Sequence, residues 1–333
     1  MDQSTPLRYL SASDVAAAMP ALPERLDLAE ATLRGLSGPA DLPAKIGVHP
    51  RPDGSFGHAM PAFLPGDAPD GSRDRLGMKW VLGFAGNSAL GMPAISALLL
   101  LNDPQSGLAT AVLDAGPITA QRTAAVSGVA IRAWAAPADP TRPRVALIGA
   151  GVQGHSHLPV LAHLLPGAEV VLFDRDPARA ESLAAVGRAL QGVAAVTVAG
   201  SARAAVEGAD VVVTAASFAP PAERQAMTND WLAPHALVVP VDYATMCSAE
   251  VARDADLFVT DHTDQFLANR DAGQFDGYPE PHAMMGAVLA SGSPRPAGRV
   301  VATHLGTGLA DVVFGSAILA EAERRGLGTL LPR

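Results

Sequence analysis

The chain has 333 residues and a net charge of −9, and it is 49% hydrophobic and 17% charged. This length allows two domains with sizeable cores, and the acidic balance without a Lys- or Arg-rich run excludes a nucleic-acid footprint. The single cysteine, Cys247, excludes an intrachain disulfide and a cysteine-rich zinc site. The N-terminus lacks the pattern of a secretory signal, and no apolar run reaches membrane-spanning length, so we expect a soluble cytoplasmic protein.

The first third of the chain is predicted to be mostly β-structure after two leading helices. The helices are expected over residues 11–19 and 26–36, each ending near a proline. Two extended segments flank Pro52-Asp53-Gly54, which predicts a hairpin. Further strands are predicted over residues 77–83, 95–101 and 109–113.

An alanine-rich segment from Thr119 to Trp134 predicts a long helix, with Thr119 as its N-cap. The proline-containing segment 137–140 follows as the predicted hinge into a second domain. Beyond it strands and helices alternate through most of the chain, which indicates a parallel sheet covered on both faces. The tail predicts a final helix over residues 312–325, and we expect it to pack back onto the first domain.

The segment 144–175 carries the strongest local signal. An apolar strand is followed by Gly149, Gly151 and Gly154 in G-x-G-x-x-G spacing, then by a helix-length segment and a second strand that ends at Asp174. These glycines permit a sharp turn, close approach of a pyrophosphate and close helix packing, while the helix N-terminus faces the phosphates. The pattern predicts a Rossmann-type dinucleotide-binding domain; the alternative is an ordinary glycine turn in a parallel sheet.

Asp174 favours NAD over NADP, because a carboxylate accepts hydrogen bonds from the ribose hydroxyls and repels a 2′-phosphate. Arg175 can accommodate that phosphate, so NADP is the less favoured alternative. Ala215 and Ser217 follow a predicted strand, at the carboxyl end of which an open α/β sheet binds ligands. The candidate cofactor-binding residues are Gly149, Gly151, Val152, Gln153, Gly154, Asp174, Arg175, Thr123, Ala215, Ser217 and Val241.

Several motifs together resemble the ornithine cyclodeaminase/mu-crystallin family over nearly the whole chain. The resemblance implies a homodimer with a mixed α+β substrate-binding and dimerisation domain, residues 1–120 and 303–333. It also implies a Rossmann NAD-binding domain with a doubly wound parallel sheet, residues 121–302. The motifs are Met60-Pro-Ala62, Lys79 in a short strand, Gly91-Met-Pro93, Asp103-Pro-Gln-Ser-Gly107, the block from Thr119 to Ser127 that contains Arg122, Gly149-Ala-Gly-Val-Gln153, and Gly306 followed by Asp311.

The resemblance also implies action on an α-amino acid or the imine derived from it. We expect an NAD(H)-dependent imine or ketimine reductase or amino-acid dehydrogenase, which moves a hydride between nicotinamide and the α-carbon. The alternative is an ornithine- or lysine-type cyclodeaminase, an ammonia lyase that uses NAD catalytically. A third possibility is a non-catalytic nucleotide-binding protein, against which the retention of Lys79 and Arg122 argues. We expect no metal, because His58, His155 and His262 lack the spacing of metal ligands.

The family pattern can be carried over residue by residue. Arg122 matches the arginine that holds the substrate carboxylate, which a planar guanidinium can pair with bidentately. Lys79 matches the lysine beside the reacting carbon and nitrogen, where a partly desolvated amine can shuttle protons. The alternatives are a salt-bridged helix arginine and a surface lysine. Lys45 lies where many members carry a second carboxylate-binding arginine, and Met60 either lines the pocket or packs in the core.

Two further candidates depart from the family pattern. Cyclodeaminases place a catalytic aspartate where this chain has Ala244, and Asp242 lies two residues earlier. If the strand continues, both face the same side, and Asp242 can act on the amino group from a shifted position; otherwise it is a capping or loop residue. The shift weakens a cyclodeaminase assignment. His304 stands where the family rarely has a histidine, and either faces the nicotinamide or the substrate, or caps a helix.

Overall fold

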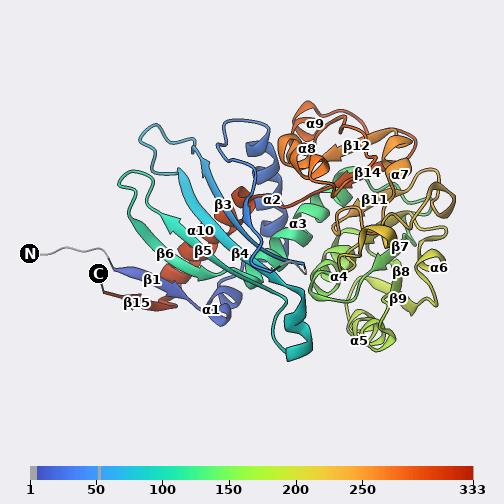
Figure 1. The fold of residues 1–333 in the computed structure, drawn as a ribbon, viewed down its shortest axis with the longest axis horizontal. Helices are drawn as coiled ribbons and strands as arrows, with labels where there is room; N and C mark the ends of the chain where they lie inside the picture. Colours follow the sequence, from blue (N-terminus) through green and yellow to red (C-terminus); the bar gives the residue numbers. More distant parts are fainter. Residues whose placement is uncertain (1–5, 52–53, 333) are drawn as a thin grey trace, which may run out of the picture. The chain divides into compact units, whose positions relative to one another are not determined.

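The computed structural model of the chain describes residues 6–51 and 54–332. The chain divides into two compact units, one of Met1–Arg122 with Gly306–Arg333 and one of Thr123–Leu305. Each unit is built on its own sheet, one mixed and one parallel, which confirms the predicted α/β class with a Rossmann-type sheet and a mixed α+β part (Figure 1). In the part of the chain that the structure describes, no helix is long and apolar enough to span a membrane.

The first unit contains a seven-stranded sheet in the order β15-β1-β6-β5-β4-β3-β2. Neighbouring strands are antiparallel except for β1 and β6, which are parallel. The pairing of β2 with β3 confirms the predicted hairpin, although Pro52 and Asp53 of its turn lie outside the described residues. The strands are β1 (Leu7–Leu10), β2 (Ile46–Val48), β3 (Ser55–Leu64), β4 (Arg75–Phe84), β5 (Ile95–Asn102), β6 (Ala109–Asp114) and β15 (Thr329–Leu331).

One long helix, α10 (Gly308–Arg325), covers a face of this sheet. It contacts β3, β4 and β5 and packs on α2 (Leu22–Leu36), which confirms that the tail helix returns to the first part of the chain (Figure 1). It begins four residues before the predicted start, because Thr307 caps it by accepting a hydrogen bond from the Ala310 N–H. The remaining short helices of this unit are α1 (Ala12–Ala17) and the 3₁₀ segment η1 (Ala85–Leu90).

Helix α3 (Gly116–Trp134) also begins earlier than predicted, so the assignment of Thr119 as its N-cap is wrong. The Thr119 N–H already donates to the Ala115 carbonyl at 2.9 Å, as a residue inside a helix does. The Asp114 carboxylate instead accepts from the Gly116 N–H at 2.9 Å. Pro117 in the first turn is compatible with this start, because the first amide groups of a helix have no intrahelical acceptor.

The second unit contains an eight-stranded sheet in the order β13-β12-β14-β11-β10-β7-β8-β9, and all its strand pairs are parallel. From β7 the chain runs outward through β8 and β9, then returns to β10 on the other side of β7. Open α/β sheets bind ligands at such a reversal, beyond the carboxyl ends of the strands. The strands are β7 (Arg144–Ile148), β8 (Ala168–Phe173), β9 (Val193–Val198), β10 (Val211–Thr214), β11 (Leu237–Pro240), β12 (Leu257–Thr260), β13 (Ala283–Met284) and β14 (Val300–Thr303).

Helices pack on this parallel sheet and bury its apolar strands. Residues Phe258 and Phe266 belong to one large core cluster that also includes Val238 and Ile148 of the sheet. Helix α5 packs against β9 and α4. The central strands β7, β10, β11 and β14 are continuous apolar runs because both their faces are buried, whereas β8 alternates between buried and partly exposed residues and the edge strand β9 is largely exposed. The helices are α4 (Val152–Leu164), α5 (Pro177–Arg188), α6 (Ala202–Val206), α7 (Ala249–Arg253), α8 (Thr263–Asp271) and α9 (Met285–Ser291), with 3₁₀ segments η2 (Pro221–Glu223) and η3 (Asn229–Trp231).

Candidate active site

Three charged side chains of the first unit meet in a buried ion cluster formed by Lys79, Arg122 and Asp311. They come from β4, α3 and α10, and all three are buried. One carboxylate oxygen of Asp311 lies 2.6 Å from the Lys79 Nζ, and the other accepts a hydrogen bond from the Arg122 Nε at 3.2 Å. The structure therefore brings the two predicted residues together and adds a carboxylate to which the sequence assigned no role.

Strand register explains why a lysine lies in this core. Lys79 is paired with Met60 on β3 and with Leu99 on β5, so the three side chains share the sheet face that α10 covers. The Thr119 hydroxyl also lies on this side, 3.5 Å from the Lys79 Nζ. Met60 is buried beside the lysine, as both its predicted roles require. Lys45, just before β2, is near enough for its charge to act on Lys79.

The electrostatics of the cluster centre on Lys79. Burial lowers the pKa of the Lys79 ammonium from 10.5 to about 7; Asp311 opposes this shift, and the charge of Arg122 adds to it. When Lys79 is protonated the cluster has two cations and one carboxylate, and therefore a net charge of plus one. The arrangement can bind an anion and can exchange a proton near neutral pH.

The chain segment before α10 comes close to this cluster because it carries glycine. Gly306 has φ +74°, a conformation that other residues rarely adopt, and a methyl group there would lie 2.2 Å from the Arg122 Nη1. The Arg122 guanidinium therefore lies directly against the backbone at residue 306. Gly306 and Asp311 thus act on the same arginine, one by leaving space and the other by ion pairing.

In the second unit, the glycine loop between β7 and α4 has the geometry that a dinucleotide needs. Gly149 has φ +105°, and a methyl group on Gly154 would lie 2.2 Å from the Gly149 carbonyl oxygen, so the turn is closed and tight. A methyl group on Gly151 would point into open space, and Val152 is 69% exposed at the helix start. An open backbone at a helix N-terminus suits a phosphate. These residues fit the pyrophosphate of a dinucleotide.

The residues around this loop have defined positions. Asp174, at the end of β8, accepts hydrogen bonds from the Ala150 N–H at 2.7 Å and the Asp176 N–H at 2.9 Å. Its carboxylate therefore lies against the glycine loop. Arg175 is exposed beside it. Among the described residues, the buried Gln153 Oε1 atom at the start of α4 has no hydrogen-bond partner.

Two adjacent strand ends meet at Asp242. Its carboxylate accepts from the Thr214 hydroxyl at 2.8 Å and from the Ala216 N–H at 3.0 Å. It thereby holds the loop that begins with Ala215 and leads to the exposed Ser217. Burial raises the pKa of Asp242 from 3.8 to about 7, although these hydrogen bonds oppose the shift.

The strand does not continue through Asp242 and Ala244, so the expectation that their side chains face the same side is wrong. The strand β11 ends at Pro240, and although Val241 still donates to the Thr214 carbonyl, the chain then turns. Tyr243 has φ +59°, and the Thr245 N–H donates to the Asp242 carbonyl at 3.1 Å. Strand alternation therefore does not apply to these residues.

The structure excludes one of the two predicted roles of His304. The helix-capping alternative is wrong, because Thr307 caps α10. His304 instead follows directly after β14, at the carboxyl edge of the parallel sheet, and its Nε2 lies 2.8 Å from the Ser127 hydroxyl. Thr123 lies on α3 one turn before that serine.

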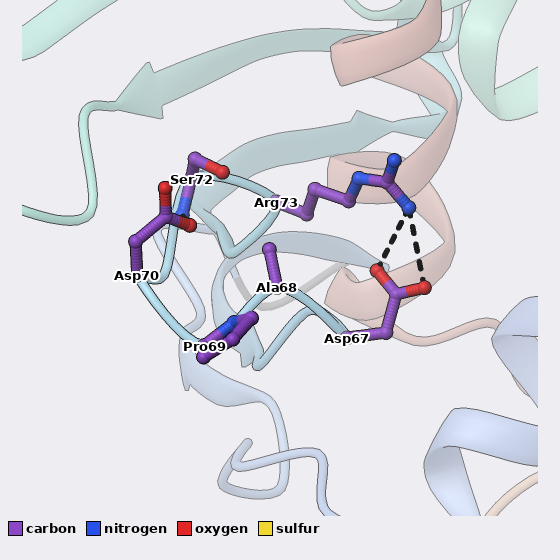
Figure 2. A pocket seen from close by; sticks show the side chains of 6 residues that line it. All are labelled: Asp67, Ala68, Pro69, Asp70, Ser72 and Arg73. Carbon is purple, nitrogen blue, oxygen red and sulfur yellow. Dashed lines mark hydrogen bonds and ion pairs between the residues drawn. The ribbon is translucent and has the colours of Figure 1, made fainter.

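A separate surface hollow of about 730 Å³ lies in the loop between β3 and β4. Figure 2 shows its lining, a polar loop in which the Arg73 guanidinium pairs with the Asp67 carboxylate at 3.0 Å. Both side chains are largely exposed, and the hollow contains neither the ion cluster nor the glycine loop. We assign it no ligand. Within residues 6–51 and 54–332, no group of three His, Cys, Asp or Glu side chains is arranged to hold a metal.

A parallel sheet with a G-x-G-x-x-G turn at its strand reversal defines the class of dinucleotide-binding α/β proteins. Within that class the chain belongs to the ornithine cyclodeaminase/mu-crystallin family, whose model matches residues 9–311. The resemblance inferred from the motifs is thereby confirmed.

Comparison with individual proteins agrees with this membership. The chain is 34% identical to nodulation efficiency protein NfeD of Rhizobium meliloti over 333 residues, 98% of both chains. It is 33% identical to the ketimine reductase mu-crystallin of Mus musculus over 177 residues, 53% of this chain and 51% of that protein. The solved structure of Thermococcus litoralis Δ1-pyrroline-2-carboxylate reductase in complex with NADH and L-proline shares the fold, with a TM-score of 0.82 at 23% identity over 97% of this chain and 99% of that chain.

Proposed function

We propose that the protein is an NAD(H)-dependent oxidoreductase that moves a hydride between nicotinamide and the α-carbon of an amino or imino acid. The observation that carries this proposal is the ion cluster, in which Lys79 and Arg122 share the single carboxylate of Asp311. A buried surplus charge is costly unless an anion compensates it. The carboxylate of an α-amino or α-imino acid supplies that anion. The ketimine reductase activity named for the mouse relative is of this kind.

The residues of the cluster divide the chemistry between them. Arg122 binds the substrate carboxylate through the guanidinium nitrogens that Asp311 leaves available, which fixes the α-carbon in one orientation. In imine reduction, protonated Lys79 donates a proton to the imine nitrogen as the α-carbon accepts a hydride, and the amine forms. Lys79 then regains a proton from solvent. When bound, NAD(H) supplies or accepts the hydride.

We propose NAD rather than NADP as the preferred cofactor. The support is the Asp174 carboxylate, held against the glycine loop by the Ala150 N–H. A 2′-phosphate at this position would meet a negative charge, whereas ribose hydroxyls would find an acceptor. Exposed Arg175 is the feature that favours NADP. We expect kcat/KM to be higher with NADH than with NADPH, and the reverse preference would contradict this assignment.

The proposal is tested by following the near-ultraviolet absorbance of NADH with the purified protein. NADH is supplied with small cyclic imino acids, and separately with 2-oxo acids plus ammonia or methylamine. We expect NADH consumption that is stoichiometric with amine formation. Ammonia release from ornithine or lysine with catalytic NAD and no net NADH change would overturn it. NADH binding without turnover of any of these substrates would favour a nucleotide-binding protein.

The second candidate is a cyclodeaminase, and Asp242 is the observation that favours it. Its buried carboxyl group has a pKa raised to about 7, as an acid–base group at neutral pH requires. Against it, both carboxylate oxygens already accept hydrogen bonds, from Thr214 and Ala216. We therefore place Asp242 in a supporting role, holding the loop that begins at Ala215.

We further propose that the protein is a homodimer. The support is the sheet face of the first unit opposite α10, where exposed Ile46 and Leu98 lie in one cross-strand row with Ala59 and Trp80. An apolar sheet face of this kind is typical of an interface. Light scattering coupled to size exclusion tests this assembly, and a monomer at micromolar concentration would contradict it. The cytoplasmic location stays a prediction.

A further inference from the structure

Three buried polar side chains of the second unit form a continuous hydrogen-bonded chain. Ser127 on α3 lies between His157 on α4 and His304 after β14, and its hydroxyl oxygen is 2.8 Å from the Nε2 of each histidine. The other ring nitrogen of His157, Nδ1, is 2.7 Å from the Gln153 carbonyl oxygen. All three side chains are at most 3% exposed. We call Ser127, His157 and His304 the relay.

The Gln153 carbonyl oxygen at one end of the relay determines the direction of each hydrogen bond along it. A carbonyl oxygen can only accept, so the His157 Nδ1 carries a proton and donates to Gln153. Burial lowers the pKa of His157 to about 4, so the ring is neutral and its Nε2 can only accept. Ser127 therefore donates its single proton to His157 and must accept from the Nε2–H of His304.

The relay connects the glycine loop to the carboxyl edge of the parallel sheet. Gln153 belongs to the glycine loop, at the first turn of α4. His304 lies at the carboxyl edge of the sheet, where an α/β protein binds its ligands. In the chain, Ser127 follows Arg122 by five residues and His304 precedes Gly306 by two. The relay thus joins the two chain segments that lead to the carboxylate-binding arginine and to the glycine against which it lies.

We propose that Ser127 and His157 are positioning residues that hold His304 in one tautomer and one ring orientation for hydride transfer at the carboxyl edge of the sheet. The proposal rests on the proposed oxidoreductase function. A satisfied polar network in a core fixes its members more sharply than apolar packing does. Apolar residues of similar volume would fill this space at a lower desolvation cost. The relay therefore serves orientation rather than stability.

The first test reads the tautomers directly. Nitrogen-15 NMR of the labelled full-length protein distinguishes Nδ1–H from Nε2–H histidine rings. We expect a neutral Nδ1–H ring for His157 and a protonated Nε2 on His304, assigned through His157→Gln and His304→Gln. An Nε2–H tautomer of His157 would reverse the relay and overturn the proposal. This measurement requires no substrate, so it stands apart from any assay of activity.

The second test separates positioning from stability. Ser127→Ala removes the central link, and we expect kcat for the imino acid to fall by about tenfold or more, while the Kd for NADH changes by less than about threefold. His157→Leu, which has no acceptor, should behave in the same way. His157→Gln can present its Oε1 where the ring presented Nε2, and we expect it to recover most of the lost kcat.

A matched control deletes a buried hydroxyl elsewhere. Thr32 on α2 is buried, and its hydroxyl donates to the Leu28 carbonyl at 2.8 Å. Thr32→Val should lower Tm without lowering kcat. If Ser127→Ala lowers Tm but keeps kcat within about twofold of the wild type, the relay is structural and the proposal fails. If wild-type protein turns over no imine although the tautomers are as expected, the proposed function fails instead.

Discussion

The two units each contain a buried polar cluster, and the two clusters differ in charge. In the first, Lys79, Arg122 and Asp311 are charged groups whose charges do not cancel when Lys79 is protonated. In the second, the Ser127 hydroxyl links His304 to His157, whose ring is neutral because burial lowers its pKa to about 4. A buried cluster with surplus charge is incomplete until a ligand of opposite charge binds, whereas the Ser127 hydroxyl already has a hydrogen-bond partner on each side. The first arrangement is suited to binding and the second to orientation.

The same contrast separates the two candidate acid–base groups. Burial moves the pKa of Lys79 down to about 7 and that of Asp242 up to about 7. Lys79 has an ionic partner and an adjacent cation, so its environment changes when a substrate carboxylate binds. Asp242 has the Thr214 hydroxyl and the Ala216 N–H as partners, both from its own unit. We therefore expect Lys79 to transfer the proton in the reaction and Asp242 to hold the loop that begins at Ala215. Four substitutions test this expectation.

The largest expected effect is that of Lys79→Met. Loss of a positioned general acid typically costs about 10²–10⁴-fold in rate, so we expect kcat for imine reduction to fall by about 10³-fold with an unchanged Kd for NADH. In the wild type, reduction requires protonated Lys79, so its rate should fall as pH rises through about 7. Oxidation of the amine requires the neutral lysine, and its rate should rise over the same interval.

The matched control is Lys45→Met, which removes the other lysine of the chain. We expect it to raise KM for the substrate and to keep a pH-dependent kcat, with the midpoint moved slightly upward because the Lys45 charge lowers the pKa of Lys79. Should Lys79→Met retain more than about a tenth of the wild-type kcat, Lys79 does not donate the proton.

Arg122→Lys is expected to have the next largest effect. Lysine keeps the charge but loses the planar fork that pairs with Asp311 and a carboxylate together. We expect kcat/KM to fall by about 100-fold, mainly through KM, corresponding to about 3 kcal/mol. Arg132→Lys changes an exposed arginine on the same helix and should have little effect. Steady-state kinetics of both variants check this, and equal losses would show that the helix rather than the guanidinium is responsible.

The main expected effect of Asp311→Asn is a change in the pKa of Lys79, with a smaller loss of activity in imine reduction than in Lys79→Met or Arg122→Lys. Asp311 raises the pKa of the Lys79 ammonium against the effect of burial, so its removal should lower that pKa below about 7. The pH at which imine reduction loses half its rate should therefore decrease, and the rate at neutral pH should fall by about tenfold. A pH profile of kcat measures both, and an unchanged midpoint would show that Lys79 is not the titrating group.

The sequence predicted the parts of the fold that depend on local pattern. The glycine loop and the Rossmann strands follow one another within a short stretch, and their apolar runs are visible without tertiary information. The strands β1 and β15 were not predicted, because they are three or four residues long and pair with segments far away in the chain. Thr119 was taken for an N-cap because its residue type suits that role, whereas Asp114 and Pro117 determine the actual start.

In the candidate site, too, the features that depend on long-range packing could not be predicted from the sequence. Lys79 and Arg122 were identified through motifs, but the role of Asp311 depends on how α10 packs on the sheet. The available signals were the motif of Gly306 followed by Asp311 and the acid in an otherwise apolar first helical turn. The relay joins Ser127 to His157 and His304, which lie 30 and 177 residues further along the chain, so no spacing rule could find it.

Asp242→Asn is expected to have the smallest effect. It tests whether Asp242, rather than Lys79, is the acid–base group of the reaction. Asparagine can still accept from the Thr214 hydroxyl but presents an amide to the Ala216 N–H, so one hydrogen bond is lost. We expect kcat for imine reduction to change by less than about threefold. In a cyclodeaminase the same change would remove the acid–base group and reduce ammonia release by about 100-fold or more.

The pH dependence of the free energy of unfolding is a second readout for Asp242→Asn. The folded-state pKa of Asp242 is raised from 3.8 to about 7, so between these pH values the native protein holds a proton that the unfolded chain releases. The contribution of Asp242 to the free energy of unfolding is therefore fully present below pH 3.8 and is lost as pH rises through about 7. Asp242→Asn should remove that part of the pH dependence in denaturant titrations. An unchanged slope together with lost turnover would place Asp242 in the reaction and favour the lyase.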